Sequence, residues 1–177
     1  MRIKNIRVHS ILNLNNFIRK QRSAVILKPL HRSGGEGITL LKPGTQIMRS
    51  FSDPVVCQRF IPEVLTDGDK RILLCNGKVV GAFCRQPKPG KFLANLHQGG
   101  RFLPASLSQR DQLIVRKVAP TLKKMGLYFV GLDVIGGYLT EINVTSPMGI
   151  REINATTGQK VEKRILDGLL KTIQQRI

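Results

Sequence analysis

The chain has 177 residues, of which 41% are hydrophobic, and this composition favours one or two globular units over a disordered chain. No apolar run approaches the ~20 residues of a membrane helix, and the N-terminus lacks the apolar core of a signal peptide, so we expect a cytoplasmic protein without a membrane partner. The 29 basic and 11 acidic residues give a net charge of +18, which indicates an anionic partner. Because the basic residues are spread along the chain and aromatic residues make up only 5%, the pattern favours a nucleotide over nucleic acid.

Short strands around one helix are predicted in the first sixty residues. The apolar spacing predicts strands at residues 6–8, 24–28, 38–41 and 54–60, and a helix at residues 13–21. Asn13 or Asn15 can cap this helix. Residues 32–37 form a glycine-rich turn between two of the strands, which predicts a hairpin with a glycine tip.

The rest of the chain predicts two further hairpins and two helices. Strands are expected at residues 70–75, 78–85, 130–134 and 139–144, and helices at residues 108–125 and 159–175. Ser108 can cap the first helix and Gly126 can end it. The polar, glycine-bearing stretch at residues 86–101 is long enough to be a functional loop. The order predicts an α+β fold in which antiparallel β hairpins pack with helices.

A lysine and a glycine-rich loop suggest a phosphate site. Lys28 ends an apolar strand shortly before Gly34, Gly35 and Gly37. Backbone N–H groups of such glycines can approach phosphate oxygens closely, and a nearby lysine adds a positive charge. The ending of a Walker A loop is absent. A glycine-rich tip is also a common plain turn, so the pattern by itself leaves both interpretations open.

Two acids and an amide in the hairpin at residues 130–144 suggest a metal site. Asp133, Glu141 and Asn143 lie on adjacent predicted strands, and the two acids interrupt otherwise apolar runs. Oxygen ligands that converge from a rigid hairpin suit Mg²⁺. The alternative is an ordinary solvated hairpin face.

The register of this hairpin decides whether the proposed ligands can converge. If Gly136 and Gly137 formed a strict two-residue loop, Asp133 would lie opposite Thr140, and Glu141 would point to the other face. We therefore predict an odd-length loop or a β-bulge between Asp133 and Glu141, with both carboxylates on one face.

Several segments together resemble prokaryotic glutathione synthetase over nearly the whole chain: VILKPL, SGGEGI, QRFIPEVLTDGDKRILLCNG, ANLHQGGR, APTLKKMGLYFVGLDVIG and YLTEINVTSPMGIREI. The combination of GLD and TEINVTSP is the most specific part. The resemblance implies the C-terminal portion of an ATP-grasp fold over residues 6–177. It implies an ATP-binding lobe at about 24–85 and, at about 86–177, a closing loop, the metal-binding hairpin and the terminal helix. The family's N-terminal substrate domain would be absent.

The resemblance also assigns cofactor roles by position. Lys28 and the glycines would contact the phosphates of ATP, and Asp69 would lie near the ribose. The adenine would be held by the hinge strand, largely through backbone groups of Gln58, Arg59, Phe60 and Ile61. The Mg²⁺ ligands, with Mn²⁺ as a substitute, would be Asp133, Glu141 and Asn143.

The implied reaction joins γ-glutamylcysteine and glycine to glutathione, with ATP converted to ADP and phosphate through an acyl phosphate. Arg71 and Arg85 would be catalytic, facing the peptide substrate and the acyl-phosphate oxygens. Substrate would also contact the closing loop at Asn95, Gly99 and Gly100. A homo-oligomer is implied for the full-length family.

Departures from the family pattern leave alternatives open. Leu93 stands where the family normally has an arginine, and His31 replaces a usual acid. Together with the absent N-terminal domain, these changes bear on turnover more than on fold. The chain could instead be a non-catalytic ATP-binding remnant, or one half of a split enzyme whose N-terminal part is encoded separately. A basic nucleic-acid-binding protein is the third interpretation.

Overall fold

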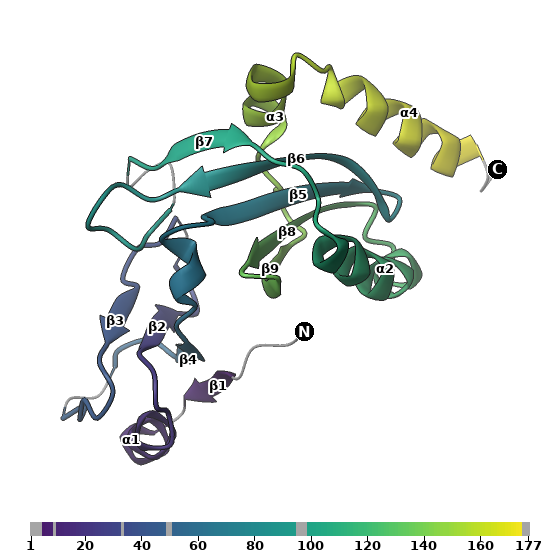
Figure 1. Cartoon of the computed structure of the whole chain (residues 1–177). Helices are drawn as coiled ribbons and strands as arrows, with labels where there is room; N and C mark the ends of the chain where they lie inside the picture. Colours follow the sequence, from purple (N-terminus) through teal and green to yellow (C-terminus); the bar gives the residue numbers. More distant parts are fainter. Residues whose placement is uncertain (1–4, 9, 33, 49–50, 95–98, 175–177) are drawn as a thin grey trace. The chain divides into compact units, whose positions relative to one another are not determined.

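The chain folds as two units, each built on its own antiparallel sheet (Figure 1). The computed structural model describes residues 5–8, 10–32, 34–48, 51–94 and 99–174. The N-terminal unit comprises Arg2–Pro62, and the C-terminal unit comprises Glu63–Ile177. The expected division at about residue 85 separates an ATP-binding lobe from the segment with the closing loop and the metal-binding hairpin. It describes function rather than these two units, and it stays a prediction. Within the described ranges, no helix is both long and apolar enough to cross a membrane.

The N-terminal unit is a four-stranded sheet with one helix packed on it. Its elements are β1 (Asn5–Val8), α1 (Ile11–Arg19), β2 (Val25–Pro29), β3 (Thr39–Leu41) and β4 (Val55–Arg59), with the sheet order β1-β4-β2-β3. Alternating side chains of β2 place Val25 and Leu27 against Leu14 and Ile18 of the helix. The predicted hairpin with a glycine tip is confirmed, because β2 and β3 pair antiparallel.

The start of α1 differs from the prediction. Ser10 caps the helix, and its hydroxyl oxygen accepts a hydrogen bond of 3.2 Å from the backbone N–H of Asn13. The expected cap at Asn13 or Asn15 is therefore wrong. The side chain of Asn15 instead exchanges hydrogen bonds of 3.0 and 2.9 Å with the backbone of Ile47, a contact across the fold that local patterns do not reveal.

The C-terminal unit is a five-stranded sheet with helices on both faces. A short 3-10 helix (Pro62–Val64) leads into it. Its elements are β5 (Asp69–Cys75), β6 (Lys78–Gln86), β7 (Arg101–Pro104), α2 (Gln109–Lys124), β8 (Phe129–Ile135), β9 (Tyr138–Asn143), α3 (Ile150–Thr157) and α4 (Val161–Gln174). The sheet order is β7-β6-β5-β8-β9, and every neighbouring pair is antiparallel.

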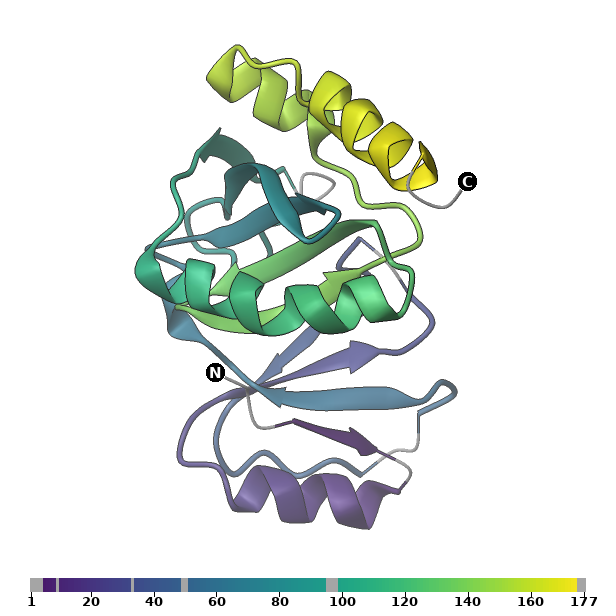
Figure 2. The same cartoon turned by 90° about the vertical axis from the view of Figure 1, so that its right-hand side faces the viewer.

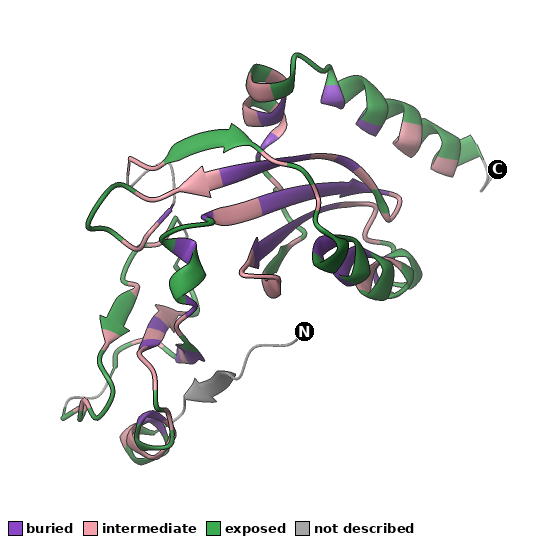
Figure 3. Cartoon of the chain, viewed as in Figure 1, coloured by how far each residue is buried: buried purple, intermediate pink, exposed green. Residues whose placement is uncertain are grey.

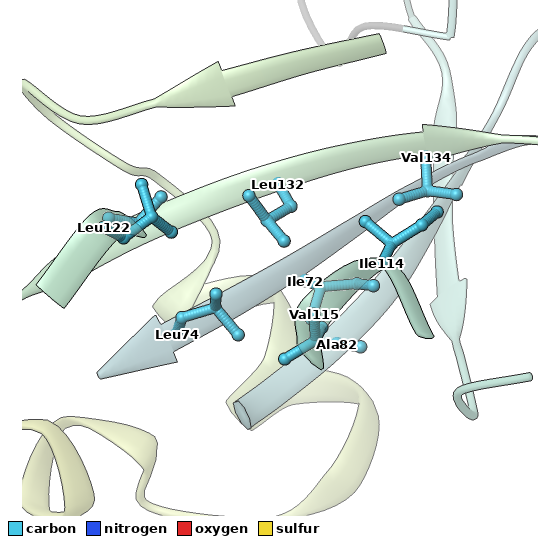
Figure 4. Close-up of a cluster of buried hydrophobic side chains, with 9 residues drawn as sticks. Ile72, Leu74, Ala82, Ile114, Val115, Leu122, Leu132 and Val134 are labelled. Atoms are coloured by element: carbon cyan, nitrogen blue, oxygen red, sulfur yellow. The ribbon is translucent and has the colours of Figure 1, made fainter. Parts of the chain in front are cut away.

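Side-chain alternation divides the core between the two faces of this sheet. One face packs on α2, and Figure 4 shows Ile72, Leu74 and Leu132 gathered with residues of that helix. The other face packs on α3 and α4, where Leu73 and Phe83 contact helix residues. Figure 2 shows α2 lying along the sheet, with α3 and α4 apart from it. Successive residues of β5 and β8 therefore face different surroundings.

The ends of α2 confirm the sequence prediction. The hydroxyl of Ser108 accepts from the backbone N–H of Asp111 at 3.2 Å, and the carboxylate of Asp111 accepts from the backbone N–H of Ser108 at 2.8 Å. This reciprocal pair is a capping box. Asp111 also forms a 2.5 Å ion pair with Lys70 of β5, which ties the start of the helix to the sheet.

Candidate functional site

The hairpin of β8 and β9 carries the residues predicted to bind a metal. Ile135 pairs with Tyr138, so the two glycines between them form a two-residue loop. The register then shifts beside Asp133, which lies opposite Glu141 and leaves Thr140 as the bulged residue. The hydroxyl of Thr140 donates a 3.0 Å hydrogen bond to the backbone carbonyl of Asp133. The predicted bulge is confirmed, and it brings both acids to one face of the hairpin.

Asn143 lies on the same face because it pairs with Gly131, two residues from Asp133. Its side-chain amide nitrogen is 3.3 Å from Oδ2 of Asp133. Arg71 occupies the space beside the glycine: a Cβ atom on Gly131 would lie 3.2 Å from Cδ of that arginine. Arg71 lies directly opposite Asp133 on the neighbouring strand, and the absence of a side chain at Gly131 leaves room for the arginine beside it.

Two arginines hold the carboxylate of Asp133. Arg71 donates to it twice, from Nε to Oδ1 at 2.5 Å and from Nη2 to Oδ2 at 3.0 Å, and its Nη1 donates to the carbonyl of Met148 at 3.0 Å. Arg85 Nη2 lies 3.0 Å from Oδ2 of Asp133 and 2.6 Å from Oδ2 of Asp69. The bidentate pair fixes the plane of the Asp133 carboxylate.

Burial and charge act in opposite directions on these groups. Burial opposes ionisation of Asp133, but the positive charge of Arg85 and the hydrogen bonds of Arg71 outweigh it and lower the pKa of that carboxyl. Burial likewise opposes the charged form of Arg85, yet the charges of Asp69 and Asp133 raise the pKa of its guanidinium. The charge of Glu141 contributes to that increase in the pKa of Arg85. The two shifts both favour the charged forms, so Asp133 and Arg85 attract each other as an ion pair.

The donor set on this face fits Mg²⁺. Among the described residues, no three His, Cys, Asp or Glu side chains gather as a metal site. The carboxylates of Asp133 and Glu141 do share one face with the amide of Asn143. This number of ligands is sufficient, because Mg²⁺ on a nucleotide ordinarily takes only one or two carboxylates together with phosphates and water. Because the amide nitrogen of Asn143 is bonded to Asp133, its oxygen is left for a cation.

In the N-terminal unit, Lys28 and Gln58 share one face of the sheet. Lys28 pairs with Val56, and Gln58 pairs with Ile26, two residues from Lys28. This face is opposite to the one that packs on α1. Gln58 is buried, and the strand is extended beyond Arg59 by a 2.9 Å hydrogen bond from the Phe60 backbone N–H to a carbonyl preceding β2. Ile61 is also buried.

The glycine-rich loop follows on the same unit. Gly34, Gly35 and Gly37 have φ values of +65°, +82° and +72°, which side-chain-bearing residues rarely adopt. Arg32 and Glu36 form an ion pair across the loop. The loop therefore has the backbone freedom that a close approach to phosphate requires, although it also satisfies the description of a tight turn.

The remaining predicted residues lie in the connection between β6 and β7. Gly99 and Gly100 are described, and a Cβ atom on Gly100 would lie 2.4 Å from the carbonyl oxygen of Ala94, so the glycine permits a close backbone approach. Asn95 lies outside the described residues.

Of the predicted site residues, the structure brings together six in the C-terminal unit: Asp69, Arg71, Arg85, Asp133, Glu141 and Asn143.

Sequence reasoning missed the carbonyl of Met148 as a partner of Arg71. A backbone acceptor leaves no trace in residue type, so no local pattern could have found it. The family-like segment that contains Met148 was the one indication that the residues after β9 belong to the site.

Comparisons with known proteins identify the family of the chain. Residues 6–158 match the family described as prokaryotic glutathione synthetase, ATP-grasp domain. The glutathione synthetase of Thermosynechococcus vestitus is 43% identical over 161 residues, covering 86% of this chain and 50% of that protein. That of Synechococcus elongatus is 44% identical over 167 residues, covering 90% and 51%. The chain therefore spans about half the length of these relatives.

Solved structures share the fold at low sequence identity. The D-cycloserine synthetase DcsG matches with a TM-score of 0.73 and 13% identity, over 97% of this chain and 65% of that chain. The ATP-grasp ligase PsnB, complexed with a precursor variant, Mg and ADP, matches with a TM-score of 0.66 and 14% identity, over 96% and 53%. These likenesses show an α+β ATP-grasp fold. With its matched family and relatives, the chain belongs to the prokaryotic glutathione synthetase family.

Proposed function

We propose that this chain binds ATP with Mg²⁺ and serves a carbon–nitrogen ligase of the glutathione synthetase type. The observation that carries the proposal is the bulged hairpin, which aligns Asp133, Glu141 and Asn143 on one face in a chain of this family. The substrates would be γ-glutamylcysteine and glycine, as the names of its relatives suggest.

In the C-terminal unit, Asp133, Glu141 and Asn143 are the proposed metal ligands. Bound Mg²⁺ would supply positive charge against the phosphate oxygens of the nucleotide. Arg71 orients the Asp133 carboxylate through its bidentate contact, and Arg85 is the proposed cation for the acyl-phosphate oxygens. Arg85 forms ion pairs with Asp69 and with Asp133, and these two pairs would hold it in place for that role.

In the N-terminal unit, Lys28 and the loop of Gly34, Gly35 and Gly37 are proposed to contact the phosphates. Lys28 is half-buried on its strand, and its ammonium would supply a positive charge to the phosphate oxygens. The positive φ values of the loop support backbone donation to phosphate. Adenine is proposed to contact backbone groups of the hinge strand, residues 58–61.

Calorimetric titration of ATP into the chain, with and without MgCl₂, tests the proposal. We expect Mg²⁺ to strengthen ATP binding, and Glu141→Gln to weaken the Mg²⁺-dependent binding about tenfold, or about 1.4 kcal/mol. Glu162→Gln removes an equally exposed acid from α4 and is the matched control, with unchanged binding expected. Absence of ATP binding, or binding indifferent to Mg²⁺ in every variant, would overturn the proposal.

A second candidate is one part of a split ligase, or an ATP-binding remnant without turnover. The observation that favours it is the coverage: the chain spans about half of its relatives. ADP release that depends on γ-glutamylcysteine and glycine separates the alternatives. The measurement is made on the chain alone and on the chain mixed with a relative's N-terminal half. ADP release in the mixture would identify a split ligase. ATP binding without ADP release, both alone and in the mixture, would identify a remnant.

A further inference from the structure

The outward surface of α2 is strongly basic. Arg116, Lys117, Lys123 and Lys124 are all exposed on this helix, and Figure 3 shows its exposed residues on the side away from the buried ones. Residues seven apart lie on nearly the same side of a helix, ~10 Å along its axis. Arg116 and Lys123 therefore form one row, and Lys117 and Lys124 a second row beside it.

Nothing on the helix neutralises this surface. Asp111 is the one acidic residue of α2, it is only 2% exposed, and its charge is paired with Lys70 on the sheet side. Arg110 lies over the ring of Tyr138 at 5.8 Å, so we leave it out of the set. Within the described part of the chain, no ion pair joins the four exposed cations to an acid.

The turn between β5 and β6 packs against this helix. A Cβ atom on Gly77 would lie 3.1 Å from Cβ of Ala119 and 3.3 Å from Cδ of Lys123, so the turn lies against the last half of α2. Lys78 follows the turn and pairs with Cys75, so its side chain lies on the α3 and α4 face of the sheet and is not part of this surface. The basic face thus consists of Arg116, Lys117, Lys123 and Lys124.

We propose that this basic face binds the phosphate backbone of double-stranded nucleic acid. The four cations span residues 116–124, ~12 Å of helix axis, a length over which a duplex presents ~7 phosphates. Lysine and arginine in rows match such a surface in charge without reading bases. An anionic membrane fits less well, because Ile114, Val115 and Leu122 of α2 are buried in the core, and Leu113 is the one large apolar residue of the helix left exposed to enter a bilayer.

The basic face lies on the opposite side of the sheet from the proposed metal ligands. Ile72 and Leu132 face α2, whereas the adjacent residues Arg71 and Asp133 face the other way. Nucleic acid on α2 therefore leaves the Asp133 cluster accessible. Failure of this inference can be distinguished from failure of the proposed ATP binding, because each surface can be altered without the other.

Fluorescence anisotropy with a labelled 20-base-pair DNA duplex, measured from 50 to 200 mM salt, tests the inference. The test variant combines Arg116→Gln, Lys117→Gln, Lys123→Gln and Lys124→Gln. The control variant removes the same charge at exposed positions elsewhere, with Lys20→Gln, Lys42→Gln, Lys160→Gln and Lys163→Gln. Thermal unfolding and ATP titration of both variants check that the fold is kept.

We expect the test variant to lose at least about tenfold in affinity at 50 mM salt, and its slope of log K against log salt to shrink by about 3–4, since each lost phosphate contact removes about one unit. The control variant should lose less than about threefold. Equal losses in the two variants would show that net charge alone drives binding and would overturn the inference. The absence of duplex binding at 50 mM salt would also overturn the inference. Tighter binding of the wild type to phosphatidylserine vesicles than to the duplex would overturn it as well.

Discussion

At the scale of single residues, Asp133 depends on its arginine neighbours for its charge and its orientation. Arg71 is 6% exposed and uses all of its side-chain nitrogens within the protein, two on Asp133 and one on the carbonyl of Met148. The sequence resemblance implied a role at the substrate, which stays a prediction. The contacts support a positioning role, in which Arg71 holds Asp133 toward the face that it shares with Glu141.

Replacing Arg71 tests this positioning. Arg71→Met leaves Asp133 buried without its bidentate partner, so we expect a loss of about 3–5 kcal/mol in stability and weaker Mg²⁺-dependent ATP binding. Arg71→Lys keeps the charge but not the planar fork, so stability should recover in part while Mg²⁺ binding stays impaired. Urea unfolding and calorimetry measure the two effects. Full Mg²⁺ binding by a folded Arg71→Met variant would contradict the positioning role.

The ion pair of Asp111 and Lys70 predicts a dependence of stability on pH. Burial raises the pKa of Asp111, but hydrogen bonds from Lys70 and from Ser108 outweigh burial and lower it overall. A lowered folded pKa stabilises the protein at pH values above the unfolded pKa of ~3.9, and this contribution disappears as the pH falls through the folded pKa.

We therefore expect Asp111→Asn to cost about 3 kcal/mol at pH 7, and the difference from the wild type to shrink below pH ~3.9. Urea unfolding at a series of pH values measures it. Asp53→Asn is the control, because Asp53 has only an exposed partner at 3.8 Å and should cost less than about 1 kcal/mol. A difference for Asp111→Asn that is constant down to pH 2 would contradict the assignment.

At the scale of elements, the bulge at Thr140 determines which residues of β9 face the cluster. Without it, the two-residue loop would place Asp133 opposite Thr140 and turn Glu141 to the α2 side. With it, the strand from Glu141 onward is shifted by one residue. Glu141 and Asn143 then share a face with Asp133.

Two deletions in β9 separate the effects of the bulge and of the register. Deleting Thr140 leaves one-to-one pairing with Asp133 still opposite Glu141, so Mg²⁺-dependent ATP binding should stay within about threefold of the wild type. Deleting Ile142 moves Asn143 opposite Leu132, onto the other face, and should weaken that binding at least about tenfold. The reverse ranking of the two deletions would be incompatible with the observed register.

The connection between β6 and β7 carries the departure at Leu93, which is half-buried. If the substrate site is otherwise intact, Leu93→Arg should tighten binding of γ-glutamylcysteine about tenfold, because arginine can pair with a carboxylate through two hydrogen bonds. Lys91→Arg, two residues earlier and exposed, is the control and should change nothing. Calorimetry with ATP present measures both, and equal affinities in all three proteins would contradict the prediction.

At the scale of the whole molecule, the matched length limits what the chain can do unaided. It spans about half of its relatives, so any group that their other half contributes to substrate binding is not supplied by these residues. Holding two reactants in a reactive geometry can lower a barrier by ~7–11 kcal/mol, and loose binding forfeits much of that.

We therefore expect the purified chain to bind ATP but to form little or no glutathione. Chromatographic detection of glutathione, with ADP release measured in parallel, checks this. The full-length glutathione synthetase of a relative serves as the positive control. Robust turnover by the 177-residue chain would contradict the prediction.

Patterns local in sequence predicted the regular elements well. Ser108 and Asp111 indicated the start of α2, and alternating apolar residues indicated the strands of the hairpins. A two-residue glycine loop would have turned Asp133 and Glu141 to opposite faces, so their predicted convergence required a bulge. The elements that were missed have weak local patterns: every residue of β7 is exposed, as Figure 3 shows, so the strand lacks alternation, and α3 is a helix of only eight residues.

The sequence by itself determined the family and the α+β class, because periodicity and residue type are properties of the chain. It also supplied the candidate residues for a nucleotide and a metal, which stay a prediction. Tertiary structure alone decided the partners, namely Arg71 with Asp133 across 62 positions and Met148 as a backbone acceptor, and it decided which side of α2 leaves its cations exposed. The physical reason is that burial and pairing depend on which strands become neighbours. That choice is made by packing over the whole unit and not by any local segment.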